Sequence, residues 1–134
     1  MKVISVEISE HKYDVYIGRD LQTHIAKQLR SLSQEQKVLI VTDKFFEKTY
    51  AKLIQKSLND SNFDCSIHVM SGGKISKSFN EVLKIYGELE VNNFARDSTL
   101  IALGGGVVGD SAGFVASTWY RGMIFVHIPT TLMA

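Results

Sequence analysis

The chain has 134 residues, 45% of them hydrophobic and 22% charged, and its formal net charge is +1. This length suits one globular domain spanning 1–134, and the near-zero charge gives no electrostatic reason to expect a nucleic acid or a membrane surface as a partner. A single cysteine, no apolar leader and no apolar run long enough to cross a membrane lead us to expect a cytoplasmic protein.

The hydrophobic pattern predicts a hairpin followed by four strands that alternate with helices. Apolar residues partly alternate with polar ones at 3–8 and 13–17, which is typical of two paired strands. Later apolar runs are continuous, as in strands buried on both faces, and the segments between them carry apolar residues at helical spacing. We expect helices at 21–32, 46–58, 79–89 and 112–118, and the later strands at 38–41, 66–70, 99–103 and 124–128.

This order predicts an α/β fold, with a Rossmann-like, mostly parallel sheet covered by helices on both faces and preceded by an N-terminal β-hairpin. In open sheets of this kind, ligands bind beyond the carboxyl ends of the strands. Polar or glycine clusters follow each of the later expected strands, at Asp43, Gly72-Gly73, Gly104–Asp110 and Thr130-Thr131. We therefore expect the ligand at this edge of the sheet.

The three consecutive glycines Gly104, Gly105 and Gly106 join a predicted strand to a predicted helix. Glycines allow positive φ angles and a close approach of backbone to ligand, and the free N–H groups of a helix start favour a pyrophosphate. The segment is not a G-x-G-x-x-G fingerprint in its usual place, and it lacks the Lys-Ser/Thr of a P-loop. We expect phosphate or dinucleotide binding, with a simple tight turn as the alternative.

Five nearby side chains each have a ligand-binding and a structural interpretation. Asp110 could bond a ligand amide or hydroxyl, or complement the helix dipole from the first turn. Asp43 could bond a ribose hydroxyl or cap the next helix, and Lys77 could neutralise a phosphate or be a solvated helix residue. Thr130 and Thr131 could offer hydroxyls to a ligand or cap a following helix.

Arg121 lies in a turn between a helix and a strand, where it could bind a phosphate bidentately or be an ordinary surface arginine. No metal site is expected, because the four histidines form no ligand pair and Cys65 has no partner. His127, between two apolar strand residues, is expected in the core.

Several motifs together resemble the 3-dehydroquinate synthases, a family of sugar phosphate cyclases that shares its fold with glycerol dehydrogenase and the iron-containing alcohol dehydrogenases. The motifs are the GGGVVGD run at 104–110, Tyr120-Arg121-Gly122, and the PTTLMA run at 129–134. Weaker matches lie at 40–43 and 73–77, so the resemblance spans the chain and is strongest in its last quarter.

The resemblance implies an NAD- and metal-dependent lyase of the shikimate pathway. This enzyme converts a small sugar phosphate, 3-deoxy-D-arabino-heptulosonate 7-phosphate, to 3-dehydroquinate and phosphate. Asp43 would contact the adenosine ribose of NAD, and Asp110 the nicotinamide end. Arg121 would bind the substrate phosphate in the site of a partner subunit, which implies a homodimer. The remaining cofactor contacts would come from Lys77, Gly105, Gly106, Val107, Thr130 and Thr131.

Two residues depart from the family pattern: Lys74 replaces a glutamate beside the cofactor ribose, and Ser111 replaces a leucine, which would loosen helix packing. The family keeps its ligands for zinc or cobalt in a helical second domain that this sequence does not reach, so we expect the chain alone to be inactive. The alternatives are another sugar phosphate cyclase, a relative of glycerol or iron-containing alcohol dehydrogenase, and a non-catalytic remnant.

Overall fold

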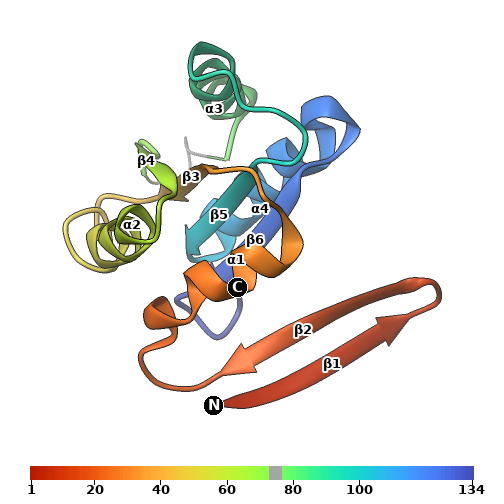
Figure 1. Cartoon of the computed structure of the whole chain (residues 1–134). Helices are drawn as coiled ribbons and strands as arrows, with labels where there is room; N and C mark the ends of the chain where they lie inside the picture. Colours follow the sequence, from red (N-terminus) through yellow and green to blue (C-terminus); the bar gives the residue numbers. More distant parts are fainter. Residues whose placement is uncertain (73–76) are drawn as a thin grey trace.

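The computed structural model describes residues 1–72 and 77–134. Over these residues it has a two-stranded antiparallel hairpin and a four-stranded parallel sheet flanked by helices (Figure 1). The strands are β1 Lys2–Ile8, β2 His11–Ile17, β3 Lys37–Thr42, β4 Asp64–Val69, β5 Thr99–Gly104 and β6 Ile124–Pro129. The helices are α1 Ile25–Leu32, α2 Tyr50–Asp60, α3 Phe79–Val91 and α4 Gly106–Thr118, with short 3-10 turns η1 Leu21–Thr23 and η3 Trp119–Arg121.

The four-stranded sheet has the order β4-β3-β5-β6, and all its neighbouring strands are parallel. At its amino edge Thr99 pairs with both Val38 and Ile124, and at its carboxyl edge Thr42 pairs with both Val69 and Leu103. The strands therefore start and finish nearly level, so that the segments leaving their carboxyl ends meet at one edge. This arrangement confirms the predicted α/β fold.

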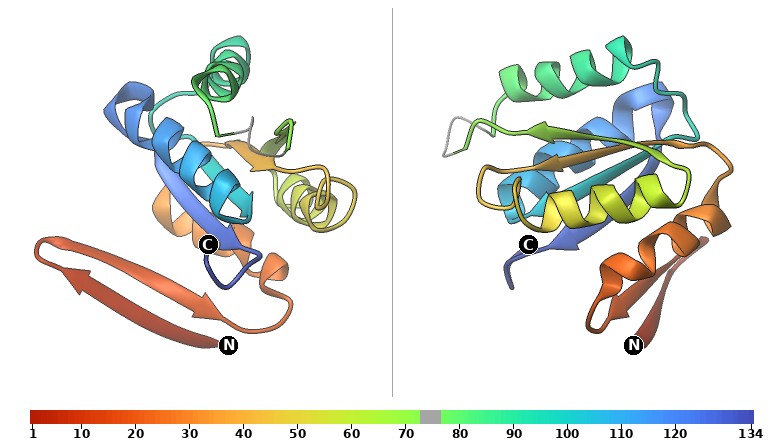
Figure 2. Two further views of the ribbon diagram at one scale, coloured as in Figure 1. Left: turned by 180° about the vertical axis from the view of Figure 1, so that it is seen from behind. Right: turned by 60° about the vertical axis from the view of Figure 1, so that its left-hand side comes forward.

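Each face of this sheet has its own apolar core. Leu39, Val41 and Leu100 pack with α3 and α4, while Val38, Ile40 and Ile101 pack with α1 and α2. The alternation follows from the pleat, which sends successive side chains to opposite faces. Full burial of each such side chain stabilises the fold by about 1.5–3 kcal/mol. Figure 2 shows these helices on the two sides of the sheet, as the sequence predicted.

The β1–β2 hairpin projects away from the four-stranded sheet (Figure 1). Its register puts Ile4 opposite Val15 and the partly buried Val6 opposite Tyr13, so these side chains share one face. The other face carries the polar pairs Ser5–Asp14 and Glu7–Lys12 and the pair Val3–Tyr16. There Tyr16 donates a hydrogen bond to Gln28 of α1 over 3.0 Å. The exposed large apolar side chains of the first face are Ile4, Ile8, Tyr13, Val15 and Ile17.

Three helices differ from the prediction at their first residues. Helix α1 begins at Ile25 rather than at residue 21, because 21–23 form the separate 3-10 turn η1. Helix α2 begins at Tyr50 rather than at residue 46, because 44–49 form turns that follow Asp43. Helix α4 begins at Gly106 rather than at residue 112, although glycine is a weak helix former. Burial of Val108 against the core, where it is 3% exposed, holds this added turn in helical form. Among the described residues, no helix has the length and apolar character needed to cross a membrane.

Candidate functional site

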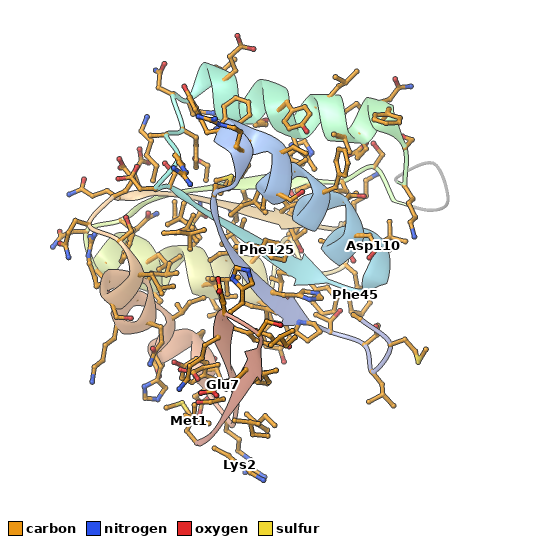
Figure 3. The ribbon with its side chains drawn as sticks, turned by 90° about the vertical axis from the view of Figure 1, so that its right-hand side faces the viewer. Met1, Lys2, Glu7, Phe45, Asp110 and Phe125 are labelled. Atoms are coloured by element: carbon orange, nitrogen blue, oxygen red, sulfur yellow. The ribbon has the colours of Figure 1, made fainter. Side chains whose placement is uncertain are left out.

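The predicted site residues, with one exception, lie at the carboxyl edge of the parallel sheet. Asp43 follows β3, Gly105 follows β5, and Thr130 follows β6. The ends of β5 and β6 are joined, because the Thr130 N–H donates to the carbonyl of Gly104 over 3.0 Å. Figure 3 shows Asp110 and Phe45 toward the same end of the molecule. Phe45 belongs to the turn that follows β3 and is the second residue after Asp43. The topology therefore gathers segments that are far apart in sequence.

The three glycines between β5 and α4 have different roles. A Cβ built on Gly104 would lie 2.7 Å from Cγ2 of Val108, so packing within the protein requires this glycine. A Cβ on Gly105 would lie 3.5 Å from Cγ2 of Thr131, and one on Gly106 would meet no described atom within 4 Å. Gly106 therefore borders open space, which is the room that a closely approaching ligand needs, whereas Thr131 lies in contact distance over Gly105.

The glycines of the turn do not use the positive φ angles that glycine allows. Among the described residues, the glycines at positive φ are Gly72 and Gly122. Gly105 is extended, with φ of −81° and ψ of −169°, and the chain passes directly from strand to helix. The first backbone N–H groups of α4 still lack partners within their own helix, and they are available to an anion at this edge.

Lys77 and Asp110 are brought together next to this turn. Lys77 Nζ lies 2.7 Å from Asp110 Oδ2, and the two side chains are 62% and 61% exposed. Asp110 is the fifth residue of α4, so it lies beyond the first turn, and the helix-dipole interpretation loses its basis. Next to the glycine turn, the Asp110 carboxylate can accept hydrogen bonds from the amide or hydroxyl groups of a ligand, and the Lys77 ammonium can bind its phosphate groups.

The side chain of Asp43 caps the turn that follows β3. Its Oδ1 accepts hydrogen bonds from the N–H groups of Phe45 and Phe46, at 2.9 and 3.2 Å. The capping interpretation is thus correct in kind, although the capped element is a turn and α2 starts later. Within 1–72 and 77–134 no hydrogen bond engages Oδ2, so this fixed carboxylate keeps one oxygen for a ligand hydroxyl. An open cleft of about 630 Å³ lies beside it, lined by Lys44, Glu47, Lys48, Val69, Met70 and Ser71.

Arg121 is the exception, because it lies at the opposite edge of the sheet. It follows the far end of α4 and precedes β6, and a helix of 13 residues is about 20 Å long. Tyr120 and Arg121 both have positive φ, at 47° and 63°, which is uncommon for residues other than glycine. The exposed Arg121 side chain is therefore held away from the glycine turn of its own chain.

Sequence reasoning missed a polar cluster between β4 and α3. Glu81 is only 2% exposed, and its carboxylate accepts bonds from the Ser71 N–H at 3.2 Å and the Ser71 hydroxyl at 3.0 Å. Burial raises the pKa of Glu81, but the Ser71 hydrogen bonds, followed by Lys84 and His68, outweigh it and lower the pKa below its usual value. The signal in the sequence was the capping-box pattern of Ser78 and Glu81.

Several other expectations can be compared with the structure. The expected core position of His127 is wrong: its side chain is exposed on β6, beside Gly109 of α4, where an added Cβ would lie 2.7 Å from its Nε2. Cys65 is buried, and this burial raises the pKa of its thiol to about 12. Ser111 is buried in α4, while Lys74 lies outside the described residues. In the part of the chain that the structure describes, no three His, Cys, Asp or Glu side chains form a cluster that could hold a metal ion.

The fold is that of the sugar phosphate cyclases and glycerol dehydrogenases. It matches 2-deoxy-scyllo-inosose synthase, solved with carbaglucose-6-phosphate, NAD+ and Co2+, with a TM-score of 0.87 at 17% identity over 97% of this chain and 35% of that one. It also matches 2-epi-5-epi-valiolone synthase from Streptomyces hygroscopicus, solved with NAD+ and Zn2+, with a TM-score of 0.76 at 24% identity over 95% of this chain and 35% of that one. Glycerol dehydrogenase from Schizosaccharomyces pombe matches with a TM-score of 0.66 at 20% identity, over 82% of this chain and 25% of that one.

Sequence comparison identifies the family within this class. The family "3-dehydroquinate synthase N-terminal" matches residues 67–134. A 3-dehydroquinate synthase of Streptococcus pneumoniae is 42% identical over 131 residues, which are 98% of this chain and 37% of the relative. The chain belongs to the 3-dehydroquinate synthase family, and it spans a little over a third of the length of the curated relatives that it matches.

Proposed function

We propose that this chain, as one N-terminal domain over 1–134, forms the NAD-binding part of a 3-dehydroquinate synthase. The observation that carries the proposal is the open space over Gly106, flanked by the Lys77–Asp110 pair at one edge of the parallel sheet. That arrangement fits a dinucleotide, because its backbone N–H groups suit a pyrophosphate and its side chains suit the groups at either end. The two neighbours solved with NAD+ bound support the same cofactor.

Each residue then has a definite part in holding the cofactor. The Gly105-Gly106-Val107 backbone cradles the pyrophosphate region, and Asp43 offers its free Oδ2 to the adenosine ribose. Asp110 bonds the nicotinamide end, and Lys77 lies beside it with its positive charge. The remaining contacts come from the hydroxyls that leave β6, Thr130 and Thr131, the second of which lies over Gly105.

The reaction that we propose for the whole enzyme is the conversion of 3-deoxy-D-arabino-heptulosonate 7-phosphate to 3-dehydroquinate and phosphate. NAD, when bound, accepts a hydride from a substrate carbinol and later returns it. This chain's contribution is to bind and orient that cofactor. This chain matches about a third of the length of its relatives. The zinc or cobalt ion of the family would be bound by residues in the remaining part of the enzyme. We therefore expect the chain alone to release no phosphate from the substrate.

We also propose that the protein is a homodimer in which Arg121 binds the substrate phosphate in the partner's site. Two observations support this. Arg121 lies at the edge of the sheet opposite to its own chain's glycine turn, about one helix length away. The hairpin also exposes an apolar face, and an isolated two-stranded hairpin is marginally stable at best. A second copy covering that face would stabilise both hairpins.

Sedimentation can test the dimer through this hairpin face. Wild-type chain is expected to sediment as a dimer, and Ile4→Lys with Val15→Lys is expected to shift it to monomer. Lys substitutions at Ser5 and Asp14, on the polar face, are the matched control and should leave the dimer intact. A monomeric wild-type chain at high concentration would contradict the proposed dimer.

A cytoplasmic location is also part of the proposal, and the single buried cysteine supports it.

Calorimetric titration tests the cofactor proposal itself. NAD+ added to the 134-residue chain should give saturable binding at one site per chain. Inorganic pyrophosphate should compete with it, because both would use the α4 N–H groups. Binding without saturation, or binding that pyrophosphate does not affect, would contradict an assignment to the glycine turn.

A further inference from the structure

Glu81 has a buried carboxylate whose hydrogen-bond partner, Ser71, lies at the surface. It belongs to the first turn of α3 and is 2% exposed, while Ser71, which donates two hydrogen bonds to it, is exposed. Lys84 Nζ adds a charge 3.5 Å from Glu81 Oε2 and also donates to the Ser71 hydroxyl over 3.2 Å. A buried charge is tolerated only where such partners compensate it. These bonds fix the path of the chain as it leaves β4.

The geometry differs from the capping box that a Ser-x-x-Glu pattern usually forms. In that motif the serine oxygen accepts from the glutamate N–H, and the glutamate carboxylate returns to the serine N–H. The first half is present, since the Glu81 N–H donates to the Ser78 hydroxyl oxygen at 3.4 Å. The carboxylate bonds Ser71 instead. One residue thereby holds both ends of the connection between β4 and α3.

That connection carries Lys77, which immediately precedes Ser78. Lys77 Nζ in turn lies 2.7 Å from Asp110 Oδ2, beside the glycine turn. A series of contacts therefore links Glu81 to the edge of the candidate site, through its carboxylate at Ser71 and its backbone N–H at Ser78. It runs from Ser71 to Glu81, from Glu81 to Ser78, and through Lys77 to Asp110.

We propose that Glu81 is a positioning residue for the cofactor site and that it acts through Lys77. The inference rests on the proposed NAD-binding function. Glu81 itself does not touch the cofactor, because its carboxylate is buried and engaged with Ser71. By fixing both ends of the connection, it limits the positions that Lys77 can take before the cofactor arrives. Such preorganisation strengthens binding, because less ordering is left for the binding step.

His68 closes the cluster on its buried side and provides a control. Its Nε2 lies 3.5 Å from Glu81 Oε1 and makes no hydrogen bond to any described residue. Its Nδ1 lies 3.8 Å from Oε1 of Glu88, one turn further along α3 than Lys84. Glu88 shares the helix and the histidine with Glu81 but makes no contact with Ser71 or Ser78 among the described residues. Glu88→Gln is therefore the matched substitution for Glu81→Gln.

The test is a double-mutant cycle on NAD+ affinity, measured by calorimetry on the 134-residue chain. Glu81→Ala should weaken binding about fivefold to tenfold in the wild-type background, with Glu81→Gln intermediate, because its amide oxygen can still accept from Ser71. In a Lys77→Ala background the same substitutions should have less than about a twofold effect. Glu88→Gln should leave the affinity unchanged. Urea unfolding of each variant establishes that it is folded, and Glu81→Gln carries the test if Glu81→Ala does not fold.

The outcomes separate the two proposals. If the wild-type chain shows no saturable NAD+ binding, the proposed function fails and the positioning role fails with it. If the wild-type chain binds NAD+ but the folded Glu81 variants bind equally well, only the positioning role is overturned. Equal losses in the wild-type and Lys77→Ala backgrounds would also overturn it, because Glu81 would then act by some route other than Lys77.

Discussion

Lys77 and Asp110 form an ion pair of 2.7 Å across 33 residues of sequence, joining the start of α3 to α4 beside the glycine turn. An exposed pair of this kind contributes only about 0.2–1 kcal/mol to stability. Its position therefore matters more than its strength. Substitution of either residue changes the candidate site while leaving the fold nearly intact, which makes the pair a sensitive probe of function.

Neutralising this pair should weaken NAD+ binding. We expect Asp110→Asn and Lys77→Met each to reduce the affinity about tenfold, because each removes a charged group that would contact the cofactor. The free energy of unfolding should change by less than about 1 kcal/mol. Calorimetry and urea unfolding measure the two quantities.

The Lys12–Glu7 pair on the hairpin is a matched control, with atoms 3.1 Å apart and side chains 60% and 71% exposed. Lys12→Met should leave NAD+ affinity unchanged. An equal loss in Lys12→Met and Lys77→Met would show that general charge, rather than the position of Lys77, governs binding.

The glycines of the turn should separate binding from stability. Gly104→Ala should destabilise the chain by roughly 1–3 kcal/mol, because its Cβ would lie 2.7 Å from Val108. Gly106→Ala should be neutral or stabilising, since the added methyl meets no described atom and alanine favours the helix. It should nevertheless weaken NAD+ binding, because the methyl would occupy the open space.

Gly87→Ala is the control for this experiment, because Gly87 lies in α3 and a Cβ there also meets no described atom within 4 Å. This substitution should stabilise the chain by about 0.5–1 kcal/mol and leave NAD+ affinity unchanged. Undiminished NAD+ binding by Gly106→Ala would count against a cofactor at the turn.

The lowered pKa of Glu81 makes its contribution to stability depend on pH. A carboxyl group with a lowered pKa in the folded state stabilises the fold above its unfolded pKa of about 4.3, and this contribution is lost as the pH falls through the folded-state value. Wild type should exceed Glu81→Gln in free energy of unfolding by roughly 1–3 kcal/mol at pH 7. Urea unfolding from pH 7 down to pH 3 should show the difference shrinking. If the difference in free energy of unfolding between wild type and Glu81→Gln grew as the pH fell, the lowered pKa of Glu81 would be contradicted.

The thiol of Cys65 should be unreactive in the native chain. Its pKa of about 12 keeps it protonated at pH 8, and it is buried, whereas an unfolded cysteine has a pKa of about 8.5. A colorimetric disulfide reagent at pH 8 should modify the native chain at least about 100-fold more slowly than the chain in guanidinium. By linkage, stability should fall as the pH rises above about 8.5. Cys65→Ala should lack this additional alkaline loss, and rapid native modification would contradict the assignment.

The fold was largely predictable, whereas parts of the site were not. The continuous apolar runs of β3 and β5 and the helical spacing in α3 reflect burial, which a single sequence records directly. The start of α4 was missed because the burial of Val108 outweighs the weak helix propensity of the neighbouring glycines. The capping role of Asp43 was foreseen only as an alternative, since the choice depends on where the turn places its N–H groups.

The Lys77–Asp110 pair and the Glu81 cluster depend on tertiary contacts between elements. The capping-box rule assigns the Glu81 carboxylate to the N–H of the helix cap. It bonds Ser71 instead, because β4 lies beside α3. The location of Arg121 follows from the length of α4, which sequence reasoning underestimated. Local pattern thus identifies which residues are polar and unusual, while the packing of helices on the sheet decides which of them meet.

Backbone amide shifts during an NAD+ titration, recorded by two-dimensional NMR on the labelled chain, test the location of the cofactor most directly. We predict progressive, saturable shifts of the Gly105, Gly106, Val107 and Asp110 amides, with no comparable change at Arg121. Saturable binding that leaves the amides of the glycine turn unmoved, or that shifts Arg121 instead, would contradict the proposal that the carboxyl edge of this sheet holds NAD.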